Sequence, residues 1–231
     1  MDCRRIFPFL ILTLTAGAWT LLAQSDGMPS VRTESAPAGT VPSPAQPWWA
    51  NRGHWNFGGQ LSFVIENPIP HDITHIKLLM AEPQVGFVVK DFDVRHFPLR
   101  RFEVLGEGVF GNAVHPGGRI TGGALLLRFE GLSRGRFLPF AEAGGGVQNT
   151  TLASRARELD GDVQFTPQGG IGLQYFFRPQ RALVFEYSFI HMSNADLQMP
   201  NLGWNGSMLT VGFRWLRRPA PGASPGEALK H

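Results

Sequence analysis

The sequence 181-RALVFEYSFIHMS-193 is the clearest indication of the fold, because its side chains alternate in character with a period of two. Successive side chains of a β-strand point to opposite faces, so alternate residues share one face. The odd-numbered face is mainly large and apolar between its ends and consists of Arg181, Leu183, Phe185, Tyr187, Phe189, His191 and Ser193. The even-numbered face includes Ala182, Glu186 and Ser188. This stretch therefore predicts a strand with one apolar face and one small or polar face.

The same alternation recurs along the chain, between breaks that are rich in turn-forming residues. It predicts strands at residues 54–66, 73–92 with a break at Pro83, 100–113, 119–131, 136–149, 163–177, 181–194 and 206–216. An even number of such alternating segments is typical of a bacterial outer-membrane barrel. We therefore expect an all-β fold, an eight-stranded antiparallel transmembrane β-barrel.

A soluble periplasmic β-sandwich or lipocalin-like barrel is the alternative fold, because its strands also alternate. In the first segment the large apolar residues Trp55, Phe57, Leu61, Phe63 and Ile65 fall on one face, and Asn56, Gly58, Gln60 and Ser62 fall on the other. A soluble barrel would have to expose its glycines and charges, whereas a membrane barrel turns the large face to lipid. The pattern favours the membrane barrel.

The inward faces of the predicted strands carry charged residues. Small eight-stranded barrels have interiors filled by side chains. The candidates for a paired polar interior are Arg128, Glu130, Glu142, Glu186 and Arg214. We expect no transport pore.

The first 48 residues differ in composition from the predicted barrel. Arg4 and Arg5 precede an apolar stretch that ends in small residues, which is the layout of a secretory signal peptide. The next segment is rich in Pro, Ser, Ala and Thr and poor in large apolar residues. We therefore divide the chain into a signal peptide at 1–23, a flexible leader at 24–48, a barrel at 49–216 and a polar C-terminal tail at 217–231. Export to the bacterial outer membrane is expected.

His191 and Ser193 end the apolar row of the seventh predicted strand, so they should emerge on the lipid-facing side of the barrel. If both chain termini are periplasmic, this strand ends at the outer leaflet. A serine hydroxyl is a weak nucleophile that needs a nearby base, and histidine suits that role near neutral pH. By itself a His-x-Ser pair is more often two polar residues at the end of a strand.

The surrounding sequence adds a longer motif. It comprises 191-HMSNA-195, Pro200-Asn201, Gly203 and Asn205, all between two predicted strands. This string resembles the signature of the lipid A 3-O-deacylase family, a family of outer-membrane esterases. The resemblance is close over residues 187–215 and looser over roughly 100–180, where Pro139-Phe140 and 143-AGGGV-147 resemble the family's middle strands.

The resemblance implies an enzyme that hydrolyses the ester of the primary acyl chain at the 3-position of lipid A. It assigns Ser193 as the nucleophile and His191 as the base of a triad that faces the membrane, with no metal or organic cofactor. It places Asn194 beside the nucleophile, so we expect its side chain, or the backbone N–H groups of Asn194 and Ala195, to form the oxyanion site. Asn201 is expected to help position this loop.

The third triad member is where the sequence departs from the best-known members of that family. The position that would carry glutamate, fourteen residues after His191, is Asn205. An asparagine oxygen can orient an imidazole, but it lends no negative charge to the imidazolium. Asp196 is the alternative acid, because its loop position frees it from the alternation, whereas Glu186 belongs to the interior face. We favour Asn205.

Two other functions are compatible with the sequence. The chain could be a non-catalytic barrel, structural or an adhesin, that keeps the motif without its acid. It could also be an esterase that acts on another membrane lipid, such as a phospholipid. Lipid A or lipopolysaccharide is the expected partner, a homodimer is possible, and the formal net charge of +3 is too small to indicate nucleic-acid binding.

Overall fold

The computed structural model describes residues 55–67, 73–92, 99–199 and 201–216. The predicted signal peptide at 1–23, the leader at 24–48 and the tail at 217–231 lie outside these residues. No helix in the described part of the chain is long and apolar enough to cross a membrane.

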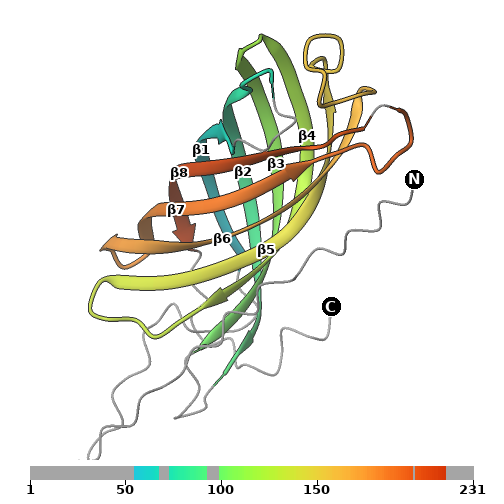
Figure 1. Cartoon of the computed structure of the whole chain (residues 1–231). Coiled ribbons are helices and arrows are strands. Elements are labelled where there is room, and N and C mark those ends of the chain that lie inside the picture. The colour runs from blue at the N-terminus through green and yellow to red at the C-terminus, as the bar shows by residue number, and fades with distance from the viewer. Residues whose placement is uncertain (1–54, 68–72, 93–98, 200, 217–231) are drawn as a thin grey trace, which may run out of the picture. The chain divides into compact units, whose positions relative to one another are not determined.

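The described strands form one closed barrel (Figure 1). They are β1 (Trp55–Glu66), β2 (Lys77–Asp91), β3 (Arg101–His115), β4 (Gly118–Glu130), β5 (Phe137–Thr150), β6 (Val163–Arg178), β7 (Arg181–Met192) and β8 (Trp204–Leu216). Each strand pairs antiparallel with the next, and β1 pairs antiparallel with β8. The predicted eight-stranded antiparallel barrel is confirmed.

The expected break at Pro83 is wrong, because β2 runs through this residue, which pairs with Gly59 of β1. Proline lacks the N–H that a ladder needs. The loss of strand pairing is local. In the β2–β3 ladder Ala81 pairs with Phe110 and Gln84 pairs with Glu107, and Glu82 and Pro83 between them have no partner on β3. Strong pairing on both sides of the gap keeps the strand continuous. The strand also begins at Lys77, later than residue 73.

The barrel interior is polar, and four of the five residues predicted to pair there, Arg128, Glu130, Glu142 and Arg214, form ion pairs, whereas the described residues show none for Glu186. The Arg128 guanidinium lies 2.6 Å from the Glu142 carboxylate. Arg214 donates to both Glu103 and Glu130, at 2.5 and 3.2 Å. All five side chains are buried. Buried charges are tolerated when they are paired and hydrogen-bonded. The Arg128–Glu142 pair joins the neighbouring strands β4 and β5, and Arg214 joins β8 to β3 and β4 across the interior.

The barrel exterior is apolar. On β7 the side chains of Leu183, Phe185, Tyr187 and Phe189 are exposed, while the inward Glu186 is buried. A soluble protein shows the opposite distribution, with charges outside and large apolar residues inside. Burial therefore agrees with the predicted direction of the alternation, and the outer wall is suited to lipid.

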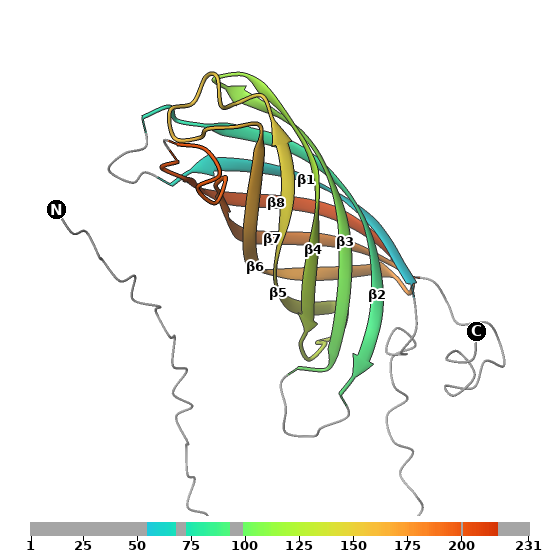
Figure 2. The ribbon, with the colours of Figure 1, turned by 90° about the vertical axis from the view of Figure 1, so that its right-hand side faces the viewer.

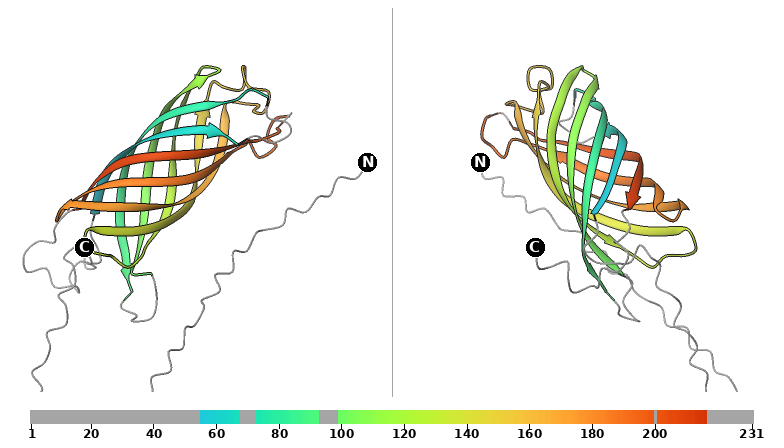
Figure 3. Two further views of the ribbon diagram at one scale, coloured as in Figure 1. Left: turned by 60° about the vertical axis from the view of Figure 1, so that its left-hand side comes forward. Right: turned by 180° about the vertical axis from the view of Figure 1, so that it is seen from behind.

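One end of the barrel carries the connections 151–162, between β5 and β6, and 193–203, between β7 and β8 (Figure 2). An apolar cluster closes this end. Leu152, Ala156 and Leu159 of the first connection pack in one cluster with Met192 and Trp204. The connections at the opposite end include the short segment 179–180 (Figure 3). Long connections gathered at one end are typical of outer-membrane barrels.

Candidate active site

The end of β7 presents His191 and Ser193 on the outer surface. Both side chains are half-buried, whereas Met192 and Asn194 between and after them are buried. Strand β7 ends at Met192. The next residue, Ser193, forms an isolated antiparallel bridge with Phe165 of β6. The Ser193 N–H donates to the Phe165 carbonyl at 3.1 Å, and the Phe165 N–H donates to the Ser193 carbonyl at 2.7 Å. Backbone pairing therefore holds Ser193 in the outward row.

His191 lies directly opposite Asn205 of β8 in the antiparallel register. The imidazole Nδ1 and the Asn205 Oδ1 are 2.8 Å apart. An amide oxygen only accepts hydrogen bonds, so this contact places the proton on Nδ1 and leaves the Nε2 lone pair available. No hydrogen bond joins the Ser193 hydroxyl to His191 within the described residues.

Asp196 does not contact the imidazole. Its carboxylate accepts a hydrogen bond from the Asn201 Nδ2 at 3.0 Å. The Asn201 Oδ1 in turn accepts the Asn194 N–H at 3.3 Å. Of the two candidates for the third position, the structure therefore brings Asn205 to His191 and holds Asp196 in the loop with Asn201.

Asn194 is turned away from the outer surface. Its buried Nδ2 donates to the carbonyls of Asp160 and Gln198, at 2.8 and 2.9 Å. Its own N–H is bound by Asn201. Both groups that the sequence suggested for the oxyanion site at this residue are thus engaged elsewhere. The amide of Asn194 anchors the loop after the nucleophile candidate to the β5–β6 connection.

Ala195 and Asp196 form a tight turn immediately after this anchor. Their φ angles are 53° and 62°, and the Leu197 N–H donates to the Asn194 carbonyl at 3.2 Å. Two residues with positive φ define a type I′ turn. This conformation costs on the order of 1 kcal/mol for each non-glycine residue and is concentrated at functional sites. The Ala195 N–H is the remaining backbone candidate for an oxyanion donor.

Gly203 forms one wall of the imidazole site. Its φ is +71°, and a Cβ built on it would lie 2.9 Å from the His191 Cε1. Its N–H donates to the carbonyl of Glu158 at 3.1 Å. The sequence motif contained Gly203 but did not assign it a role. The hydrogen bond from Gly203 to the Glu158 carbonyl could not be predicted from the sequence, because it depends on how two separate loops meet.

Glu158 is a fully buried acid in the β5–β6 connection. Burial raises the pKa of a carboxyl group, but here the hydrogen bonds from the Thr74 hydroxyl and from the backbone of Ile73 and Thr74 outweigh it, so the pKa of Glu158 is lowered below its ordinary value. Stability from a lowered pKa is present above the unfolded-state pKa and is lost as pH falls through the folded-state value.

We therefore expect the loops at this end to loosen under acid conditions while the barrel wall persists. Below about pH 4, amide hydrogen exchange at Ile73 and Thr74 should accelerate relative to exchange in the mid-strand residues of β7. In Glu158→Gln, which cannot lose a proton, the same comparison should show a weaker dependence on pH. Equal pH dependence in the two proteins would contradict this assignment.

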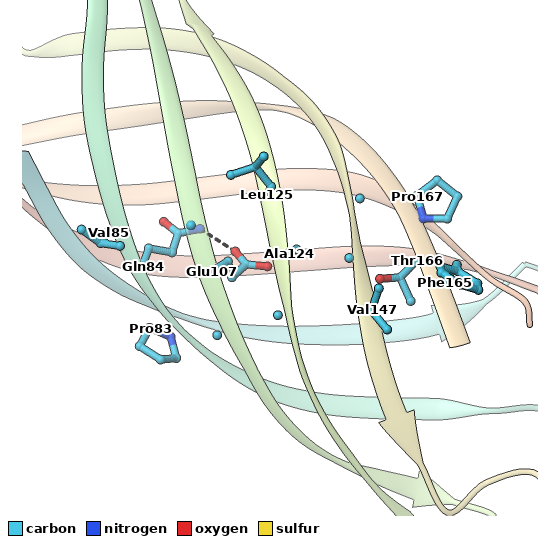
Figure 4. Close-up of a pocket in the computed structure, with 15 residues that line it drawn as sticks. Pro83, Gln84, Val85, Glu107, Ala124, Leu125, Val147, Phe165, Thr166 and Pro167 are labelled. Carbon is cyan, nitrogen blue, oxygen red and sulfur yellow. Dashed lines mark hydrogen bonds between the residues drawn. The ribbon is translucent and has the colours of Figure 1, made fainter. Parts of the chain in front are cut away.

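A hollow of about 920 Å³ lies on the outer wall across β2 to β6 (Figure 4). Its outward-facing lining includes the exposed side chains of Val85, Leu125, Val147 and Phe165 together with Gly106, Gly108, Gly123, Gly145 and Pro167. The buried, inward-facing Gln84, Glu107 and Thr166 also line it. The Phe165 edge adjoins the site, because this residue pairs with Ser193. The outward-facing part of the hollow is therefore apolar, and its Phe165 edge lies next to the candidate nucleophile.

Two kinds of glycine shape this wall. A Cβ at the inward Gly144 would lie 2.1 Å from the Leu125 carbonyl oxygen, so barrel packing requires glycine there. At the outward Gly106 and Gly145, an added Cβ would make only ordinary contacts at 3.6 and 3.5 Å. Packing does not demand glycine at the outward positions, and their absent side chains leave the hollow open.

An apolar exterior, a polar paired interior and a closed antiparallel wall define an outer-membrane β-barrel protein. Residues 90–214 match the family model described as "Lipid A 3-O-deacylase (PagL)". The chain belongs to this family, as the motif suggested, and its place is the bacterial outer membrane.

Solved structures with the same fold include the outer membrane enzyme PagL, which is 18% identical with a TM-score of 0.50 over 66% of this chain and 97% of that chain. Neisserial surface protein A is 9% identical, with a TM-score of 0.49 over 70% of this chain and 96% of that chain. A comparison with curated protein sequences gives no match.

Proposed function

We propose that this protein is an outer-membrane esterase that hydrolyses the 3-O-linked acyl chain of lipid A, with Ser193 as nucleophile and His191 as base. The main support is the 2.8 Å contact between the His191 Nδ1 and the Asn205 Oδ1 on the lipid-facing side of the barrel. His191 lies two residues before Ser193 on the same face. Polar side chains in such a position are costly unless they have a function. Membership of the lipid A 3-O-deacylase family supports the substrate class.

In the proposed reaction, Asn205 holds the proton on the His191 Nδ1 and Nε2 accepts the proton of Ser193. The Ser193 Oγ then attacks the ester carbonyl carbon, and the resulting oxyanion faces the Ala195 N–H. Collapse of the intermediate breaks the ester C–O bond, and the imidazolium returns its proton to the sugar oxygen. Water, deprotonated by His191, then hydrolyses the acyl-enzyme and releases the 3-hydroxy fatty acid.

The direct test is to produce the protein in an outer membrane and determine the mass of the extracted lipid A. We expect a loss of mass equal to one 3-hydroxyacyl group. Unchanged lipid A from a correctly folded barrel would contradict this substrate. Mass analysis of the phospholipids from the same membranes would then detect a deacylase with another lipid substrate, and unchanged phospholipids as well would favour the non-catalytic barrel.

Gly145→Leu should fill the hollow and impair long-chain substrates. An acyl chain is expected to lie in the apolar part of the hollow beside Phe165. A Cβ at Gly145 would make only ordinary contacts, so a leucine there should extend into that space. We expect kcat/KM for lipid A to fall about tenfold, since a lost apolar contact of this size is worth about 1–3 kcal/mol. Hydrolysis of a water-soluble acetate ester should be unchanged.

Ala141→Leu is the matched control for this experiment. Ala141 is exposed on the same strand as Gly145 but does not line the hollow. The control should leave both activities unchanged. Equal effects of the two substitutions would show that the hollow does not receive the acyl chain.

A further inference from the structure

Glu158 connects separate loops at the site end of the barrel. Its Oε1 accepts hydrogen bonds from the N–H groups of Ile73 and Thr74, at 2.6 and 2.8 Å, and its Oε2 accepts the Thr74 hydroxyl at 2.5 Å. These partners belong to the β1–β2 connection. A buried carboxylate is tolerated only when its oxygens are hydrogen-bonded. The side chain of Glu158 therefore fixes the β5–β6 connection to the β1–β2 connection.

The main chain of Glu158 reaches the third loop. Its carbonyl accepts the N–H of Gly203 at 3.1 Å. Gly203 lies against the imidazole: the Cβ position built on it is 2.9 Å from the His191 Cε1 and 3.4 Å from Nε2. Nε2 is the nitrogen that the proposed mechanism uses. A displacement of Glu158 would therefore move the wall that confines this edge of the ring.

The same connection also supports the other end of the β7–β8 loop. Asp160, two residues after Glu158, accepts the Asn194 Nδ2 at its carbonyl. The β5–β6 connection thus holds the β7–β8 loop near both of its ends, next to Ser193 and next to the start of β8. These supports come from a segment far from the motif in sequence.

We propose that Glu158 is a positioning residue that sets the orientation of the His191 imidazole through Gly203. It contacts neither the substrate nor the reacting atoms. The inference rests on the proposed esterase function, because orientation of Nε2 matters to turnover only if His191 is the base. Misplacement of a catalytic group by about 1 Å can cost about 10²-fold in rate.

The test compares Glu158→Ala with Glu158→Gln. The alanine variant removes every acceptor for Ile73 and Thr74, so we expect kcat on lipid A to fall about 10- to 100-fold with KM within about threefold. Glutamine keeps a carbonyl oxygen for the backbone donors, and its amide can donate to the Thr74 hydroxyl. It should recover most of the lost turnover. A folded alanine variant with wild-type kcat, or one altered in KM alone, would overturn the proposal.

Thr151→Val is the matched control. Thr151 lies at the start of the same connection, and its hydroxyl accepts the N–H of Arg119 rather than any group near His191. Loss of this bond should leave kcat unchanged. An equal fall in kcat would show that general loosening of the loop, not Glu158, determines the effect.

A readout independent of hydrolysis separates failure of this inference from failure of the proposed function. NMR of the ¹⁵N-labelled imidazole should show changed or broadened His191 Nε2 and Nδ1 signals in Glu158→Ala and wild-type signals in Thr151→Val. Unchanged signals in Glu158→Ala overturn the positioning role even if the protein is an esterase. The esterase function itself is tested by treating the wild-type barrel with a fluorophosphonate, which labels an active serine. A wild-type barrel that is inactive and leaves Ser193 unlabelled would contradict the proposed esterase function. The imidazole NMR signals would still show whether Glu158 positions His191.

Discussion

Ser193→Ala is expected to reduce deacylation of lipid A by about 10³-fold or more, because no other group in the proposed mechanism can form the acyl-enzyme. The substitution removes one hydroxyl from a half-buried side chain, while the backbone bonds to Phe165 do not involve that hydroxyl. The barrel should therefore fold normally. Mass spectrometry of lipid A gives the turnover, and the mobility of the unheated protein in an SDS gel reports the folded barrel.

Ser188→Ala provides the matched control on the same strand. Ser188 is buried on the interior face of β7, and its hydroxyl has no hydrogen-bond partner within the described residues. Its loss should change neither turnover nor folding. If Ser193→Ala retained activity while the wild-type protein deacylated lipid A, the nucleophile would have to be another residue.

The barrel could be predicted from the sequence because lipid imposes a simple rule on every strand. Residues that face the bilayer must be apolar and residues that face a narrow interior must be small or paired, so the two faces differ strongly along β7. The same rule placed His191 and Ser193 outside, which agrees with their half-buried side chains beside the buried Met192.

The loops follow no comparable rule. The sequence suggested the side chain of Asn194, or the backbone N–H groups of Asn194 and Ala195, for an oxyanion site. The Asn194 amide donates to the carbonyl of Asp160, and only the folded loops bring these two residues together. Glu158 is an acid among polar loop residues and would be expected in solvent. Its burial depends on donors from Ile73 and Thr74, which are 85 and 84 residues away in sequence. Alternation within one strand carries no information on such contacts.

Asn205 gives the second large effect. Asn205→Leu removes the oxygen that fixes the Nδ1 proton of His191, so the imidazole is free to rotate and to adopt the other tautomer. We expect turnover of lipid A to fall at least about 10²-fold, since loss of a correctly orienting partner costs up to about 10⁴-fold in serine hydrolases. Lipid A mass analysis at several times after induction gives the rate.

Asn205→Glu should act in the opposite direction, because it supplies the carboxylate that the resemblance led us to expect at this position. Its negative charge would stabilise the imidazolium formed during attack, and we expect turnover to rise about tenfold.

Asp196→Asn separates the two candidates for the third position. Asp196 contacts Asn201 and not His191, so this variant should keep wild-type turnover. A large loss in Asp196→Asn together with a small loss in Asn205→Leu would transfer the role to Asp196, and the loop would then have to move on substrate binding to bring that carboxylate to the imidazole.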